Sequence, residues 1–241
     1  MAIDTSYLKI LKQTVDLLST EKPRQELQAL CLAYPDLVVP TAVLREFFGE
    51  ELLEKLPARP DAGDIWAWHG LSGVKDQIFD TLKFLERLGF RADVIDIAAI
   101  RGDERIVDLN HPLPIDLVRR YDLVLDTGTC EHCFNVGQAF LNACEAVAQG
   151  GYLVHAAPTT KSNHGFWNFC PTVYPDFLED NGFEMLFFSG VKGGLKEGLK
   201  FFPIEPFSRK ALPVEAAIYV VAKRIKIESP KWPVQRKYRK I

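Results

Sequence analysis

The first 57 residues show the apolar spacing of amphipathic helices. In the first segment, apolar side chains recur at helical spacing, at Leu8, Ile10, Leu11, Val15 and Leu18. This period places them on one face of a helix. Thr20 and Pro23 indicate where that helix ends and a second begins, and residues 41–56 are predicted as a third. We therefore predict a helical cap over residues 1–57, followed by a Pro- and Gly-rich linker at 57–63.

After the linker, short apolar runs alternate with helical segments. The runs predicted as strands are 65–68, 92–97, 105–108, 123–126, 152–157, 183–189 and 214–222. The segments predicted as helices are 76–88, 136–148 and 171–180. Near-continuous apolar strands separated by helices indicate a mainly parallel sheet covered on both faces. We predict an α/β core over residues 58–228 and a basic tail over 229–241.

The segment 122–151 is the most informative part of the chain. Its apolar run ends at Asp126 and leads into a turn of small residues, Thr127-Gly128-Thr129, and then into Glu131-His132. A helix, two glycines and a second apolar run follow, which is the order of a right-handed βαβ unit. Its polar residues therefore lie at the carboxyl end of a strand, where open α/β sheets bind ligands.

This segment, read as DLVLDTGTCEH and followed by a helix and GGYL, resembles the central part of class I S-adenosylmethionine-dependent methyltransferases. The resemblance runs loosely from 65 to 222 and is closest from 121 to 183. It implies a Rossmann-like, seven-stranded, mainly parallel sheet with helices on both faces, an antiparallel last strand and N-terminal helices covering the acceptor. It also implies S-adenosyl-L-methionine as the cofactor. The later strings NHGFWNF and NGF resemble a subgroup associated with small-molecule or sugar modification.

The resemblance assigns cofactor contacts to the turn after the first predicted strand. This turn contains His69, Gly70, Ser72 and Gly73, and glycines let a backbone approach a nucleoside closely. The turn has the pattern G-x-x-G, whereas the family shows G-x-G-x-G. The alternative is an ordinary loop with two turn glycines.

Further cofactor contacts are expected at three more strand ends. An acid at the position of Asp96 can accept hydrogen bonds from both ribose hydroxyls. By the resemblance, Asp108 and Leu109 contact the adenine. The remaining three, at the methionine end of the cofactor, are Asp126, Thr127 and Gly128. The alternative is that these carboxylates only cap strands.

His132 is the first candidate for a general base. Its unperturbed pKa of about 6.5 suits proton removal from a hydroxyl near neutral pH. Glu131 or Asp126 is the candidate orienting acid, and His164 is the second candidate base. The alternative is that His132 only shapes the pocket. By contrast, His155 lies within an apolar run and is interpreted as a core histidine.

The segment after the fifth strand is predicted to form a wall of the acceptor site. Asn163, Phe166 and Trp167 are the candidate substrate-binding residues, and the aromatic rings could stack on a sugar. The alternative is that these rings belong to the core.

Composition narrows the class of protein. The chain has 241 residues, a formal net charge of −3 and 47% hydrophobic residues, which favours a globular protein and argues against a nucleic-acid partner. No apolar run reaches about 18 residues, so no membrane span is expected and a cytoplasmic location is predicted. The five cysteines lack the spacing of a metal site, and no metal is predicted at Cys130 and Cys133. The sequence leaves the oligomeric state open, and a homo-oligomer is possible.

The sequence therefore predicts a methyltransferase that uses S-adenosyl-L-methionine for O-methylation of a small molecule or saccharide, as in small-molecule or carbohydrate biosynthesis. The main alternative is a methyltransferase-like binding or scaffold protein that transfers no methyl group, which the sparse glycine turn favours. A nicotinamide-dependent oxidoreductase would need G-x-G-x-x-G at the first turn, and the chain lacks it.

Overall fold

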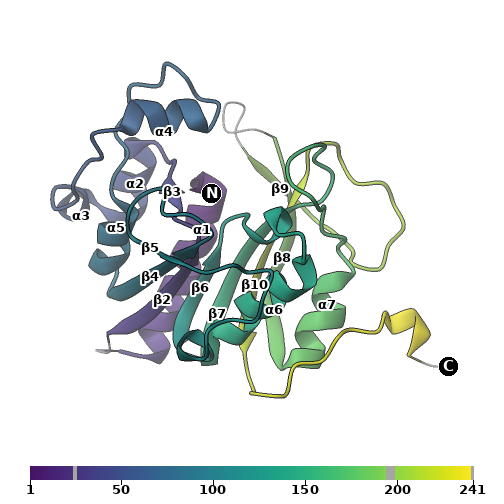
Figure 1. The fold of residues 1–241 in the computed structure, drawn as a ribbon. Coiled ribbons are helices and arrows are strands. Elements are labelled where there is room, and N and C mark those ends of the chain that lie inside the picture. The colour runs from purple at the N-terminus through teal and green to yellow at the C-terminus, as the bar shows by residue number, and fades with distance from the viewer. Residues whose placement is uncertain (24–25, 194–198, 240–241) are drawn as a thin grey trace.

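A single twisted sheet organises the computed structural model, which describes residues 1–23, 26–193 and 199–239. Its eight strands lie in the order β5-β4-β2-β6-β7-β10-β8-β9 (Figure 1). Their bounds are β2 (Leu27–Leu32), β4 (Phe90–Asp96), β5 (Glu104–Ile106), β6 (Tyr121–Asp126), β7 (Val147–Pro158), β8 (Phe183–Lys192), β9 (Lys200–Phe202) and β10 (Ala217–Arg224). The first five of these in the sheet are parallel, and β10 is antiparallel to both β7 and β8. The predicted Rossmann-like α/β fold is confirmed, with eight described strands instead of seven.

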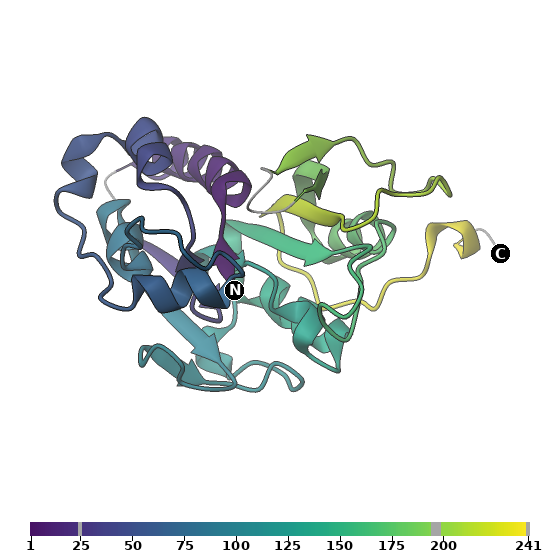
Figure 2. The ribbon, with the colours of Figure 1, turned by 90° about the horizontal axis from the view of Figure 1, so that it is seen from above.

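Helices cover both faces of this sheet (Figure 2). One face packs against α1 (Thr5–Glu21), α2 (Thr41–Phe48) and α5 (Thr81–Arg87). The opposite face packs against α6 (Val136–Ala146) and α7 (Val173–Leu178). Because successive strand residues point to opposite faces, β2 contributes Ala29 and Cys31 to the first core and Leu30 and Leu32 to the second.

The remaining elements lie at the edges of this framework. They are the parallel pair β1 (Ala2–Ile3) and β3 (Asp36–Leu37), the helices α3 (Glu50–Leu53) and α4 (Ala62–Trp68), and the 3₁₀ turns η1 (Ile115–Leu117), η2 (Cys130–His132), η3 (Glu179–Asn181) and η4 (Arg236–Tyr238). After β10 the chain folds back toward α7, and η4 lies in this last segment.

The prediction of a helical cap is wrong for Leu27–Leu32, which forms the central strand β2. All but one of its residues are buried, because β4 and β6 flank it and helices cover both faces. A fully buried strand is apolar at every position, so periodicity does not separate it from a buried helix. A boundary at residue 57 would cut this strand from its own sheet.

The predicted first strand at 65–68 is also wrong, because these residues end the helix α4. The Trp66 indole N–H donates to the Asp76 carbonyl at 2.9 Å and fixes the helix against the following loop. A run of four apolar residues is too short to distinguish a strand from a helix. The first strand of the sheet is therefore β2.

The basic tail packs against the rest of the chain. Arg236 forms an ion pair with Glu179 at 2.7 Å, and Arg239 forms one with Asp180 at 2.7 Å. The Lys231 backbone N–H donates to the Asn181 side chain at 2.8 Å. Part of the positive charge of the tail is therefore neutralised by the acidic end of α7 and η3.

Candidate functional site

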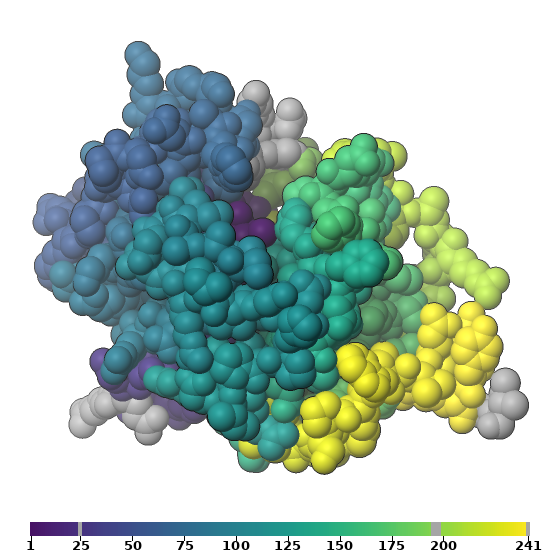
Figure 3. All heavy atoms as spheres, viewed as in Figure 1, coloured from purple at the N-terminus to yellow at the C-terminus, as the bar shows by residue number. Residues whose placement is uncertain are grey.

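Two adjoining pockets lie at the carboxyl ends of the parallel strands. The chain leaves β2 toward β4 and β5 on one side and later adds β6 and β7 on the other, so strand order reverses at β2. Ligands bind at such a switch point in open α/β sheets. The β4-side pocket has a volume of about 420 Å³, and the β7-side pocket has one of about 570 Å³. Figure 3 shows the surface hollowed between the two halves of the molecule, where the N-terminal segment (purple) is visible. Met1, Trp68 and His132 line both pockets.

The β4-side pocket brings together three of the predicted cofactor residues. Asp96 stands at the end of β4, and Asp108 and Leu109 follow β5. Asp96 Oδ1 accepts a hydrogen bond from the Ile97 N–H at 2.6 Å, and partial burial raises the pKa of this carboxyl. Asp108 Oδ1 accepts from the backbone and side-chain nitrogens of Asn110 at 2.9 and 2.7 Å. The pocket thus offers carboxylates beside the buried apolar surface of Leu109.

The turn that follows β2 also lines this pocket, and sequence reasoning missed it. It contains Ala33 and Tyr34, and Ala33 has a φ of 63°, in the left-handed region that glycine favours. Asp36 follows Pro35 and is buried, and the Arg101 guanidinium donates two hydrogen bonds to it at 3.0 and 2.7 Å. The signal in the sequence was the apolar run 27–32 ending in Ala-Tyr-Pro-Asp.

The predicted glycine turn does not occupy this place. Gly70, Ser72 and Gly73 follow the helix α4 and contribute to neither pocket. His69 lines the β7-side pocket, and its Nε2 lies 3.0 Å from Asp36 Oδ2. The assignment of Gly70, Ser72 and Gly73 to the nucleoside is corrected, because that assignment assumed a strand before the turn.

Asp126 is buried within a saturated hydrogen-bond network. Its Oδ1 accepts from the backbone N–H groups of Gly128 and Thr129 at 3.1 and 2.7 Å, and its Oδ2 lies 2.8 Å from His155 Nδ1. His155 Nε2 in turn lies 3.0 Å from the Tyr174 hydroxyl. Burial alone would raise the pKa of Asp126, but His155 and these hydrogen bonds bring it below its usual value.

This network changes one assignment and supports another. Asp126 lines neither pocket, so its carboxylate does not face a ligand and the assignment to the cofactor is corrected. His155 is a hydrogen-bonded core histidine, as its apolar surroundings indicated. Cys130 packs beside the pair, where burial raises the pKa of its thiol. Thr127 and Gly128 do line the β7-side pocket.

Glu131, His132 and His164 meet at the wall of the β7-side pocket. The Glu131 side chain is 1% exposed, whereas those of His132 and His164 are 40% and 43% exposed. Glu131 Oε1 lies 3.5 Å from His164 Nε2 and 4.0 Å from His132 Nε2. Among the described residues, neither Glu131 oxygen has a hydrogen-bond partner. Burial, only partly opposed by Glu131, lowers the pKa of His132, which favours a neutral imidazole.

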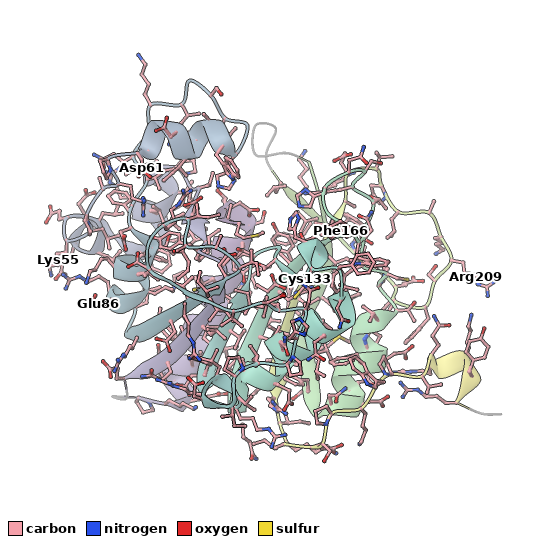
Figure 4. All side chains as sticks on the ribbon, in the orientation of Figure 1. Lys55, Asp61, Glu86, Cys133, Phe166 and Arg209 are labelled. Carbon is pink, nitrogen blue, oxygen red and sulfur yellow. The ribbon has the colours of Figure 1, made fainter. Side chains whose placement is uncertain are left out.

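The predicted acceptor residues lie beside this cluster, on the loop that follows β7. Asn163, Phe166 and Trp167 are exposed and are absent from the linings of both pockets. Phe134, which the sequence reasoning missed, packs edge-on against Phe166 with ring centroids 5.9 Å apart, and its carbonyl accepts from the Trp167 indole at 3.1 Å. The labelled Cys133 and Phe166 in Figure 4 mark the two segments that carry the histidines and these rings.

Within the described residues, no helix combines the length and the apolar character required to cross a bilayer. No protein-family model matches the sequence, and no curated protein matches it.

Several solved structures resemble the chain. The citrinin polyketide synthase CMeT domain shares 13% identity with a TM-score of 0.49, over 90% of this chain and 52% of that one. A putative sarcosine dimethylglycine methyltransferase from Galdieria sulphuraria shares 10% identity with a TM-score of 0.42, over 77% and 60%. The 1,6-didemethyltoxoflavin-N1-methyltransferase from Burkholderia thailandensis shares 14% identity with a TM-score of 0.44, over 94% and 92%. The chain thus spans only about half of the first structure, and the function has to be argued from the site itself.

Proposed function

We propose that the protein is an S-adenosylmethionine-dependent methyltransferase that methylates a hydroxyl group of a small molecule or saccharide. The observation that carries the proposal is the pair of adjoining pockets at the strand-order switch. One pocket offers strand-end carboxylates, the other offers a carboxylate with two imidazoles, and His132 lines both. A cofactor and an acceptor bound in the two pockets would therefore meet at His132.

The β4-side pocket has the chemistry to hold the nucleoside part of the cofactor. The Asp96 carboxylate at the end of β4 is placed to accept hydrogen bonds from two ribose hydroxyls. Leu109 offers an apolar surface to a flat ring, and Asp108 beside it offers an acceptor for an amino group. The turn after β2 carries no glycine, but Ala33 adopts the left-handed conformation that a glycine turn would supply.

The β7-side pocket has the chemistry to hold a hydroxylated acceptor. Its lining includes Asp4, Lys161 and Glu215 in addition to the Glu131, His132 and His164 cluster. When bound, S-adenosylmethionine supplies an electrophilic methyl group, and transfer needs little beyond in-line positioning and loss of the acceptor proton. His132 is the first candidate to accept that proton and His164 the second, with Glu131 orienting them.

Calorimetric titration of the purified chain with S-adenosylmethionine, and separately with S-adenosylhomocysteine, tests the cofactor assignment. We expect binding near 1 μM, which corresponds to about −8 kcal/mol. Asp96→Ala should weaken binding at least tenfold, while Asp103→Ala, an exposed acid on the following loop that contributes to neither pocket, should not. Equal affinity in the Asp96→Ala variant and the wild type would overturn the ribose assignment.

A methyltransferase-like binding or scaffold protein without methyl transfer is the second candidate. The observation in its favour is the sequence Ala33-Tyr34-Pro35 at the turn where the family has glycines. Side chains at these positions leave less room for a ligand than glycines would. No binding of either compound up to millimolar concentration, by protein that circular dichroism shows to be folded, would select this candidate.

A further inference from the structure

We propose that Glu131, His132 and His164 form a binding site for one divalent transition-metal ion on the wall of the β7-side pocket. Metal binding itself does not depend on the proposed function. Its consequence for the acceptor does rest on that function.

The buried carboxylate of Glu131 is the first observation. Its side chain is 1% exposed, and neither oxygen has a hydrogen-bond partner among the described residues. Burying an ionised carboxylate is costly unless a positive charge or a set of donors compensates for it. The buried Asp126, in contrast, has its oxygens bound by two backbone N–H groups and by His155. A cation bound beside Glu131 would supply this compensation.

Two glycines leave the space in which this carboxylate lies. A Cβ atom at Gly128 would come within 2.9 Å of Glu131 Oε1, and one at Gly165 within 3.0 Å of Glu131 Cγ. A side chain at Gly128 would displace the Glu131 carboxylate, and one at Gly165 would also meet the Glu131 backbone carbonyl at 2.9 Å. The backbone is thus shaped around this position of Glu131.

The ligand atoms are the second observation. Glu131 Oε1 and the two histidine Nε2 atoms all lie within 4.8 Å of one another. Zinc bonds to nitrogen and carboxylate oxygen are about 2.0–2.2 Å long, so ligand atoms around one ion stand about 3–3.5 Å apart. His164 Nε2 is already 3.5 Å from the carboxylate oxygen, and His132 Nε2 is 4.0 Å from it. Both imidazoles are about 40% exposed, so neighbouring side chains leave their rings room to rotate toward a bound ion.

The donor set indicates the class of ion. Two imidazoles and one carboxylate suit Zn²⁺ and Fe²⁺, and such three-residue sets leave at least one coordination position for water or substrate. Because the cluster lines the β7-side pocket, that position faces the space proposed for the acceptor. An acceptor oxygen bound to the ion would have a lowered pKa. In the metal-loaded protein, His132 Nε2 would be a ligand of the ion. The ion, instead of His132, would then promote loss of the proton from the acceptor hydroxyl.

Calorimetric titration of the metal-stripped full chain with Zn²⁺ tests the site without cofactor or acceptor. We expect one ion per chain with a Kd of about 1 μM or lower. His132→Ala, His164→Ala and Glu131→Gln should each weaken binding at least tenfold. The matched control is His111→Ala, because His111 is 77% exposed, lies 3.7 Å from Asp108 and contributes to neither pocket.

Titration with Co²⁺ identifies the ligands independently. Visible d–d absorption without a thiolate charge-transfer band is expected for nitrogen and oxygen ligands. A thiolate band would place the ion on a cysteine such as Cys133 and overturn the assignment. Absence of Zn²⁺ binding up to 1 mM, or equal binding by wild type and both histidine variants, would also overturn it. If Glu131→Gln fails to fold, His164→Ala still tests the site, because His164 is exposed. A chain that binds Zn²⁺ but not S-adenosylmethionine would retain this site and lose the proposed function.

Discussion

Two carboxylate–histidine clusters lie at the carboxyl ends of β6 and β7 and differ in how their hydrogen-bonding groups are satisfied. In the first, Asp126 and His155 are fully buried. Each carboxylate oxygen of Asp126 and each ring nitrogen of His155 has a partner within 3.1 Å. In the second, the Glu131 carboxyl group is buried beside two half-exposed histidines and has no hydrogen-bond partner among the described residues. Burial is therefore common to both, and it does not distinguish a structural cluster from a functional one. The two clusters differ in whether their polar side-chain atoms have hydrogen-bond partners and in whether they line a pocket.

The largest effect that we expect is on the stability of the saturated cluster. Asp126→Ala leaves His155 and two backbone N–H groups without their acceptor, and breaking such a buried pair costs about 3–5 kcal/mol. Urea unfolding should show this loss in the free energy of unfolding. Asp16→Ala serves as the control, because it removes an exposed carboxylate paired with Lys12 and should change stability little. If Asp126→Ala lowered the free energy of unfolding no more than Asp16→Ala does, the buried cluster would not be the structural one.

The second effect is on turnover and concerns the unsatisfied cluster. His132→Ala should lower turnover about 100-fold through loss of the group that faces the acceptor, while sparing S-adenosylmethionine binding and the urea midpoint. Release of S-adenosylhomocysteine in the presence of a panel of saccharides and hydroxylated small molecules measures turnover. Asp103→Ala, which changes an exposed acid outside both pockets, is the control. Full turnover in the His132→Ala variant would transfer the role to His164.

A third buried carboxylate, Asp36, sharpens the comparison through pH. Burial would raise the pKa of Asp36, but hydrogen bonds with His69 and Arg101 outweigh it and hold the pKa below the usual 3.8. Asp36→Asn should cost about 1.5–3 kcal/mol, because these bonds involve charged groups. For a carboxyl with a lowered pKa, this stabilisation is complete above pH 3.8 and disappears as the pH falls through the folded-state value.

Urea unfolding of wild type and Asp36→Asn at pH 7, 5 and 3 follows this dependence. The difference between the two proteins should be smaller at pH 3 than at pH 5. A difference that grows between pH 5 and pH 3 would show that Asp36 gains no stabilisation from His69 and Arg101.

The smallest expected effect is the most direct contrast with Asp126. Glu131→Gln replaces a buried carboxyl group, which has no hydrogen-bond partner among the described residues, by an amide of similar shape. The free energy of unfolding should therefore stay equal to that of the wild type or rise. The measurement is the same urea titration, with the metal removed from both proteins. Destabilisation comparable to that of Asp126→Ala would mean that Glu131 is a structural residue.

Much of the fold could be predicted from local sequence patterns. The strands from β4 to β8 and the helix α6 were found because each apolar run is bounded by turn residues, and the βαβ order of 122–151 places polar residues at strand ends. Asp96, Asp108 and Leu109 were chosen by position, and they line one pocket because parallel strands end at the same edge of the sheet.

The tertiary structure alone decided which strand is central and which polar residues face a pocket. Residues 27–32 are apolar at nearly every position, and only pairing with β4 and β6 makes them a strand. The roles of Asp126 and Glu131 depend on partners far along the chain, since His155 saturates the first and His164 approaches the second. Local sequence determines which segments form strands and helices, whereas hydrogen-bond satisfaction depends on side chains that only the folded chain brings together.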